Sequence, residues 1–375
     1  EVGLHDLDPR TPMRALTVAE TQMVEIARAL SARARLVIMD EPTAALSAAD
    51  VHALFEVIRR LRDRGVAFLY VSHHLQEIFE LADELTVLRD GRHIATRPVG
   101  DVTMEELVRL IVGRDPRDLT FGGERATPGD TVLEVRDVAR PPLLAGVSFD
   151  VRSGEILAIT GAIGSGRTEL ARALVGVERL TGGEVRIPAV GPVRSPAHAA
   201  RHGIAYLPED RKRHGILATR DITDNVDVGW LATTRSILDR PGRRCAAARR
   251  QVAALGVKTP NLRQQARRLS GGNQQKMLLG RWLAVDARVL LLDGPTEGVD
   301  IGSKLEIYAL LRRLAADGVA VVLFTSDLEE AQLVADRAIG LRRGRIAGEL
   351  TGDDITEQAL LELQYGTTTK EMAGA

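Results

Sequence analysis

Blocks of apolar and polar residues alternate along the chain with two different periods. Short, almost wholly apolar runs at residues 36–39, 156–160 and 289–292 predict buried strands. Stretches with an apolar residue every three or four positions, at residues 19–30 and 168–175, predict amphipathic helices. Strands and helices that alternate in this way predict an α/β fold in which the carboxyl edge of a parallel sheet binds the ligand.

The chain holds two copies of one pattern. The first copy, LTVAETQMVEIARALSARARLVIMDEPTAALS, begins at Leu16, and the second, LSGGNQQKMLLGRWLAVDARVLLLDGPTEGVD, begins at Leu269, 253 positions later. The same offset relates Asp40 to Asp293 without a gap. A register kept over about 75 positions indicates duplication of a whole domain.

A change of composition marks the boundary between the two domains. Residues 115–130, DPRDLTFGGERATPGD, are rich in Gly, Pro and charge and predict a linker between a first domain at residues 1–114 and a second at residues 131–375. Further predicted elements are helices at residues 48–64, 302–316 and 354–364, and strands at residues 67–71, 132–138, 147–151 and 320–324.

Composition narrows the class of protein. A net charge of −1 gives no overall attraction to nucleic acid or anionic lipid, and 3% aromatic residues are too few to favour base stacking on exposed rings. No apolar run approaches the roughly 18 residues that span a bilayer, and the first residues do not read as a signal peptide, so we expect a cytoplasmic protein. Cys245 is the single cysteine and predicts an ordinary reduced thiol. The arginine-rich run at residues 240–250 predicts the solvated face of a helix.

One glycine-rich segment predicts a phosphate site. Strand 156–160 leads directly into GAIGSGRT and then into a helix, which is the context that a phosphate loop requires. Glycines let consecutive N–H groups point at a phosphate, and the Thr168 hydroxyl can join a magnesium shell. Arg167 stands at the position of the usual lysine and keeps the charge in a planar, bulkier group.

These motifs resemble those of ATP-binding cassette (ABC) ATPases. LSGGNQQ resembles the family signature, VIMDEPT and VLLLDGPT resemble two Walker B strands, and GAIGSGRTEL resembles a Walker A loop. With LPEDRKRHGI between Walker A and signature, the chain is similar, over nearly its whole length, to the second half of fused double-cassette ATPases that import ribose, galactose, xylose and related sugars. The resemblance implies P-loop NTPase folds in tandem, with a mixed sheet core and a helical subdomain.

The resemblance also implies ATP and Mg²⁺ as cofactors and assigns roles to residues. Catalytic roles fall on Glu41 and His73. Metal ligands are Asp40, Thr168 and Asp293. Nucleotide-binding residues are Gly161, Gly164, Ser165, Gly166, Arg167, Thr168, Glu209, Ser270, Gly271, Gly272 and Gln274.

The two copies depart from the family pattern at different positions. Gly294 stands where hydrolytic members have the glutamate that polarises water, Ser326 stands at the equivalent of His73, and Ala19 replaces a signature glycine. In this family the Walker motifs of one cassette bind ATP together with the signature of the other. The resemblance therefore implies one competent site, with Glu41 and the second signature, and one degenerate site that holds nucleotide without splitting it.

The first copy has no phosphate loop within this sequence, since the offset places the equivalent of Gly161 ahead of residue 1. Two alternatives stay open: a fragment of a longer protein, or a truncated product that cannot hydrolyse ATP alone.

The function implied is that of the ATP-hydrolysing subunit of a bacterial monosaccharide importer, peripheral at the cytoplasmic face of the plasma membrane. The resemblance implies integral membrane permease subunits as partners, an extracytoplasmic sugar-binding protein as an indirect partner, association with a second ATPase copy as an option, and no nucleic acid. Alternatives are a nucleoside-type importer ATPase, a non-hydrolysing nucleotide-binding remnant, and a soluble tandem ATPase acting on ribosomes or DNA, which the short Gly-rich join disfavours. The sequence does not specify the sugar.

Overall fold

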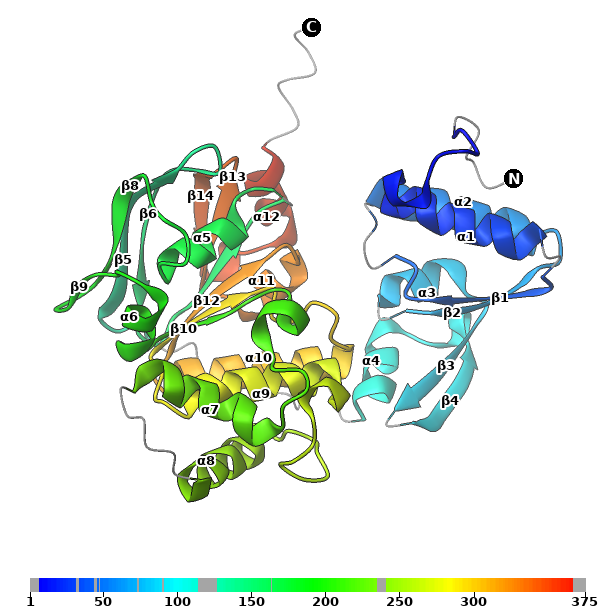
Figure 1. Ribbon diagram of the computed structural model, residues 1–375. Coiled ribbons are helices and arrows are strands. Elements are labelled where there is room, and N and C mark those ends of the chain that lie inside the picture. Colours follow the sequence, from blue (N-terminus) through cyan, green and yellow to red (C-terminus); the bar gives the residue numbers. More distant parts are fainter. Residues whose placement is uncertain are drawn as a thin grey trace, which may run out of the picture. The chain divides into compact units, whose positions relative to one another are not determined.

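The computed structural model divides the chain into two compact units, Glu1–Pro116 and Arg117–Ala375. The structure describes residues 7–31, 34–43, 46, 48–72, 74–89, 91–113, 127–162, 164–234 and 241–366. In Figure 1 the first unit is blue and cyan, and the second runs from green to red. Most of the predicted linker lies outside the described residues, so the domain boundaries at residues 114 and 131 stay a prediction.

The first unit is built on a parallel pair of strands with helices packed against it. β1 pairs with β2 so that Leu36 lies opposite Ala67 and Asp40 opposite Val71. The core forms because buried side chains of α2, such as Leu54, Phe55 and Ile58, recur at helical spacing and meet the apolar face of the strands. Its elements are α1 (Val18–Ser31), β1 (Leu36–Asp40), α2 (Ala48–Arg62), β2 (Ala67–Val71), α3 (Leu75–Leu81), the hairpin β3 (Glu84–Arg89) with β4 (Arg92–Pro98), and α4 (Met104–Val112), besides two short 3₁₀ turns, Met13–Ala15 and Val99–Asp101.

The other face of β1 and β2 is apolar and exposed. Four side chains on it are between 45% and 65% exposed: Leu36, Ile38, Leu69 and Val71. Their equivalents in the second unit are at most 3% exposed: Val289, Leu291, Val322 and Phe324. The duplicated strands therefore have two apolar faces in both units, and only the second unit covers both of them within the described residues.

The second unit contains a six-stranded mixed sheet. Its strand order is β10-β11-β12-β7-β13-β14, parallel except for the β13–β14 hairpin. One face packs against α7, α9 and α10, and the other packs against α5 and a four-stranded antiparallel sheet, β6-β5-β8-β9 (Figure 1). The sheet strands are β7 (Ile156–Thr160), β10 (Ile204–Leu207), β11 (Val289–Asp293), β12 (Ala320–Thr325), β13 (Arg337–Arg342) and β14 (Arg345–Thr351). The antiparallel strands are β5 (Thr131–Arg140), β6 (Leu144–Arg152), β8 (Gly182–Ile187) and β9 (Gly191–Pro192).

Helices complete the second unit. Between β10 and α9 the chain forms a helical subdomain around α7 and α8, as the sequence predicted, although residues 235–240 lie outside the described part. The helices are α5 (Arg167–Leu174), α6 (Pro196–Arg201), α7 (Ile222–Thr233), α8 (Pro241–Ala254), α9 (Gly271–Leu283), α10 (Ile301–Ala316), α11 (Leu328–Val334) and α12 (Glu357–Tyr365), with short turns at Arg211–Gly215, Ala266–Arg268 and Gly352–Asp354. The predicted α/β class and mixed sheet are confirmed.

A buried ion pair ties α10 to the central strands. Arg312 Nη1 donates to Asp336 Oδ1 at 2.6 Å, and the N–H of Ile156 donates to Asp336 Oδ2 at 2.9 Å. Both charged side chains are at most 10% exposed. At the equivalent positions of the first unit, Arg59 pairs with Glu80 at 2.8 Å and the side chain of Asp83 is 87% exposed. The duplicated Arg and Asp are thus a buried pair in one unit only.

We expect Asp336→Asn to lower the free energy of unfolding of the second unit by about 3 kcal/mol, because a neutral amide leaves the buried Arg312 charge unpaired. Urea unfolding followed by the fluorescence of Trp230 and Trp282, both in the second unit, measures this change. Asp83→Asn is the matched control, and circular dichroism is expected to show a change below about 0.5 kcal/mol. Similar losses in both variants would contradict the difference in burial.

Candidate functional site

The residues of the predicted phosphate loop lie at the carboxyl edge of the six-stranded sheet. β7 ends at Thr160 and lies between β12 and β13 in the sheet, and α5 begins at Arg167. The loop between them contains Gly161, Gly164, Ser165 and Gly166, while Ile163 lies outside the described residues. The strand, loop and helix therefore follow in the order that binding of a phosphate at a helix N-terminus requires.

The loop has the backbone that its glycines allow. Gly164 and Gly166 have φ of +80° and +101°, in the left-handed region that favours glycine. A Cβ at Gly161 would lie 2.5 Å from the carbonyl oxygen of Leu341, so only glycine fits there. The Ser165 hydroxyl is buried and makes no hydrogen bond within the described part of the chain. A buried hydroxyl without a partner in this loop fits an oxygen-rich ligand.

Asp293 ends the fully buried strand β11 and is itself 3% exposed. The hydroxyl of Thr168 donates to its Oδ1 at 3.4 Å, and the hydroxyl of Tyr206 donates to its Oδ2 at 3.2 Å. Burial, and then the charge of Glu209, raise the pKa of Asp293 to about 6. A buried carboxylate beside a threonine hydroxyl is a fitting pair of ligands for Mg²⁺, which takes one or two protein carboxylates together with phosphate oxygens and water.

Two further carboxylates and one cation share this edge. The Thr168 hydroxyl also lies 3.4 Å from Glu209 Oε2, so the predicted Glu209 is close to the predicted Thr168. The pKa of Glu297 is raised to about 7, first by loss of hydration and then by the charge of Glu209. Burial lowers the pKa of Arg167, which the charges of Asp293, Glu297 and Glu209 oppose. Three acids around one arginine leave an excess of negative charge that a bound cation would neutralise.

The second signature begins α9. Ser270 is exposed at the N-cap, and its side chain accepts no hydrogen bond from the helix backbone within the described residues, which leaves the first N–H groups of a 13-residue helix available to an anion. Gln274 is 4% exposed, and its Nε2 donates to the carbonyl oxygen of Ala266 at 3.1 Å. A Cβ at Gly272 would lie 2.3 Å from the Cβ of Ser303. Ser270 therefore faces solvent, whereas Gln274 and Gly272 have packing roles inside the unit.

Arg211, in the segment LPEDRKRHGI, is a residue that the sequence did not single out. It is 8% exposed, and its Nη1 and Nη2 donate to the carbonyl oxygens of Glu297 and Gly298 at 2.6 and 2.9 Å. Its Nε donates to Gln274 Oε1 at 3.4 Å, and a Cβ at Gly271 would lie 2.7 Å from its Nη2. One guanidinium thus joins the LPEDRKRHGI segment to the signature helix and to the loop after β11.

In the first unit, Asp40 and Glu41 lie at the carboxyl end of β1 and are exposed. The N–H of Glu41 donates to the carbonyl oxygen of Val71 at 2.8 Å, and the N–H of Gly294 donates to that of Phe324 at 2.9 Å. Glu41 and Gly294 have φ of +47° and +52°. The two positions therefore share one backbone geometry and differ in the side chain. The predicted His73 lies outside the described residues.

The N-termini of the two signature helices differ in their polar contacts. In α1, the Glu20 carboxylate accepts from the N–H of Thr17 at 2.7 Å, and the Thr17 hydroxyl accepts from the N–H of Glu20 at 3.2 Å, which is a capping box. At the equivalent positions of α9, Asn273 Nδ2 donates to the hydroxyl of Ser270 at 2.8 Å. A carboxylate at the start of α1 repels an anion there. The capping contacts of Glu20 thus occupy the N–H group of Thr17 at the start of the first signature helix, whereas the second signature has no carboxylate at the equivalent position.

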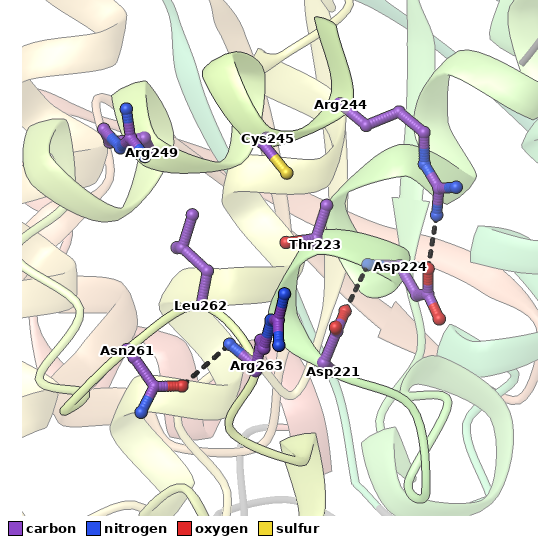
Figure 2. Close-up of a pocket in the computed structure, with 9 residues that line it drawn as sticks. All are labelled: Asp221, Thr223, Asp224, Arg244, Cys245, Arg249, Asn261, Leu262 and Arg263. Atoms are coloured by element: carbon purple, nitrogen blue, oxygen red, sulfur yellow. Dashed lines mark hydrogen bonds and ion pairs between the residues drawn. The ribbon is translucent and has the colours of Figure 1, made fainter. Parts of the chain in front are cut away.

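A cavity of about 650 Å³ lies on the helical subdomain, away from the phosphate loop. Figure 2 shows it between α7, α8 and residues 261–263, with the thiol of Cys245 near its centre. Arg244 closes one side by pairing with Asp224 and, at 3.1 Å, with Asp227. Its lining contains none of the motif residues predicted to bind nucleotide.

The sequence of this chain is similar to those of known ATP-binding proteins. Residues 144–297 match the family described as ABC transporter. The chain is 44% identical over 367 residues to a putative ribose/galactose/methyl galactoside import ATP-binding protein 2 of Burkholderia cenocepacia, covering 96% of this chain and 70% of that protein. It is also 44% identical over 366 residues to a ribose import ATP-binding protein RbsA 1 of Streptomyces coelicolor, covering 96% and 72%.

Solved structures share the fold of this chain at low identity. A nucleotide-free ATP-binding cassette from an ABC transporter superposes with a TM-score of 0.56 at 21% identity, covering 62% of this chain and 96% of that one. Another ATP-binding cassette, in its ADP conformation, gives a TM-score of 0.55 at 20% identity, covering 62% and 98%.

We expect Asp293→Asn to stabilise the ligand-free chain at pH 7 by about 2 kcal/mol, because it removes a buried charge. That the substitution stabilises the chain follows from the raised pKa of Asp293. A carboxyl whose pKa is raised from 3.8 unfolded to about 6 folded binds its proton more tightly in the folded state, so its ionisation lowers stability as pH rises from about 4 to 6. Urea unfolding between pH 4 and 7 measures both effects. A parallel pH dependence in the chain and the variant would contradict the assignment.

Proposed function

This chain belongs to the ATP-binding proteins of ABC transporters, and on that premise we propose that it is the ATP-hydrolysing subunit of a bacterial importer for monosaccharides. Two relatives that it matches over 96% of its length are named for import of ribose or of ribose, galactose and methyl galactoside. The observation that supports the proposal most directly is the approach of Thr168 to Asp293 over the glycine loop, because it brings a phosphate site and a magnesium ligand together.

Nucleotide binding by the second unit follows from its own residues. The N–H groups of the loop at Gly164 and Gly166 and the N-terminus of α5 receive the phosphates, and Arg167 adds a positive charge. Thr168 and Asp293 would hold Mg²⁺, which supplies neutralisation of the phosphate charge when bound. Glu209 lies beside both, where its carboxylate can orient water near the terminal phosphate.

Hydrolysis is proposed to depend on the first unit. Glu41 is the base that takes a proton from the attacking water, Asp40 is a metal ligand, and His73 contacts the terminal phosphate. Two observations favour this assignment: the exposed position of Glu41 at the carboxyl end of β1, and the identical backbone of Gly294, which presents no side chain. The second unit is proposed to retain nucleotide.

The partners proposed are integral membrane permease subunits, with a sugar-binding protein on the outer side and the ATPase at the cytoplasmic face. None of the described helices is long and apolar enough to cross a membrane. The net charge of −1 gives no support to the alternative of an ATPase acting on ribosomes or DNA.

Uptake of labelled sugars tests the transport proposal. Cells that express the permease are expected to accumulate ribose, galactose or xylose only when this ATPase is present and active. Labelled nucleosides are the matched comparison, since the nucleoside-type importer is the competing assignment. Accumulation of nucleosides without sugars would overturn the proposed substrate class, and accumulation of neither would contradict a role in import.

In the assembled transporter, Glu41→Gln is expected to lower steady-state ATP hydrolysis about 10²- to 10⁴-fold, because a positioned base is lost. Gly294→Glu is the matched variant at the equivalent position and is expected to change hydrolysis less than about threefold. Release of phosphate, measured at saturating ATP, gives both values. Equal losses from changes in either unit would contradict the assignment of hydrolysis to the first.

A further inference from the structure

The space beside Gly294 is filled by a carboxylate from another residue. A Cβ built on Gly294 would lie 2.9 Å from Cδ of Glu297 and 3.0 Å from its Oε1. The carboxyl group of Glu297 therefore lies in the direction in which a side chain at position 294 would project. Residue 294 itself is held by the hydrogen bond from its N–H to Phe324, so this direction is fixed by the sheet.

The two copies of the motif distribute their acids in opposite ways. The first reads DEPTA, with Glu41 after the aspartate and Ala44 three residues further on. The second reads DGPTE, with Gly294 after the aspartate and Glu297 three residues further on. Each copy thus has one glutamate within the four positions after the aspartate, residues 41–44 and 294–297. At the first of these positions, Glu41 and Gly294 have similar φ angles.

Glu297 is held by its surroundings. Arg211 binds its carbonyl oxygen at 2.6 Å and that of Gly298 at 2.9 Å, which fixes the backbone from the buried side. Loss of hydration, and then the negative charges of Glu209 and Asp293, raise the pKa of its carboxyl group, and the positive charge of Arg167 opposes them. A cavity of about 250 Å³, lined by Glu209, Asp210, Arg211, Lys212 and Glu297, opens beside it. The backbone of Glu297 is therefore held, and its exposed carboxyl group lies close to the predicted nucleotide-binding residues and is accessible to water.

We propose that Glu297 supplies, in the second unit, the carboxylate that polarises the attacking water in place of the side chain missing at Gly294. The inference rests on the proposed function of an importer ATPase and revises one part of it: the second unit, instead of only retaining nucleotide, hydrolyses it slowly. The oxygen of water attacks the γ-phosphorus of ATP, and the bond from that phosphorus to the β–γ bridging oxygen breaks. One water proton passes to the Glu297 carboxylate and then to the released phosphate, leaving ADP and inorganic phosphate.

A space-filling role for Glu297 makes a different prediction. A side chain that only fills the gap would be replaced by glutamine without loss, since Gln has the same length and shape. A water-polarising carboxylate cannot be replaced by an amide, because the amide oxygen is a far weaker base. In a chain without the Glu297 carboxylate, a glutamate introduced at position 294 would restore hydrolysis only if hydrolysis requires a carboxylate at this place.

The test uses the whole chain with Glu41→Gln, which removes the base of the first unit. Single-turnover hydrolysis of ATP with Mg²⁺, at protein in excess over ATP, is measured beside the affinity for a fluorescent ATP analogue. Adding Glu297→Gln is expected to lower the single-turnover rate about 10²-fold and to change the affinity less than about threefold. Glu184→Gln, an exposed acid on β8, is the control and is expected to leave both unchanged.

A relocation variant distinguishes the loss of a carboxylate from a structural defect caused by changing Glu297. Gly294→Glu combined with Glu297→Ala is expected to recover the rate to within about tenfold, since Glu41 shows that a glutamate adopts this backbone. Three results would overturn the proposal. The first is an unchanged rate in Glu297→Gln, the second is a relocation variant as slow as Glu297→Ala alone, and the third is no hydrolysis at all in the Glu41→Gln chain. The importer assignment fails separately, through the absence of ATPase-dependent sugar uptake.

Discussion

The burial of one negative charge is the constraint on which the site depends. Asp293 ends a strand that is apolar on both faces, so its carboxylate sits at the rim of a dry core rather than in water. The hydroxyls of Thr168 and Tyr206 compensate only in part, and the raised pKa of Asp293 shows the remaining cost. An arriving divalent cation relieves this cost, and the free energy released favours binding of the metal–nucleotide complex over binding of the nucleotide alone.

The sequence predicted strands that have a clear apolar run or alternation, among them the half-exposed β1 and β2. Strands such as β7 and β11 appear as apolar runs because both of their faces are covered, and the phosphate loop follows from its glycine spacing. The hairpins β3–β4 and β13–β14 were missed because their apolar runs are short and lie between charged residues, as in DELTVLRDGRH and DRAIGLRRGR.

The site residues that escaped sequence reasoning are those defined by contacts in space. Arg211 stands in a charged segment, and its burial follows only from the carbonyl groups that the fold places around it. Glu297 lies four positions after Asp293 in the sequence. Its carboxyl group lies where a side chain at position 294 would project because the backbone of Gly294 is left-handed, and a glycine in a sequence does not reveal which conformation its backbone adopts. The constant offset of 253 between the two copies is the sequence signal that could have identified Glu297, because it aligns Glu41 with Gly294 and Ala44 with Glu297.

The face of β1 and β2 that the described residues leave exposed affects how this polypeptide behaves in concentrated solution. Leu36, Ile38, Leu69 and Val71 form a flat aliphatic surface on two neighbouring strands, of the kind that adheres to other apolar surfaces, including its own in a second molecule. A charged substitution at Ile38, the most exposed of the four, is expected to reduce self-association of this polypeptide while leaving the buried side of the strand intact.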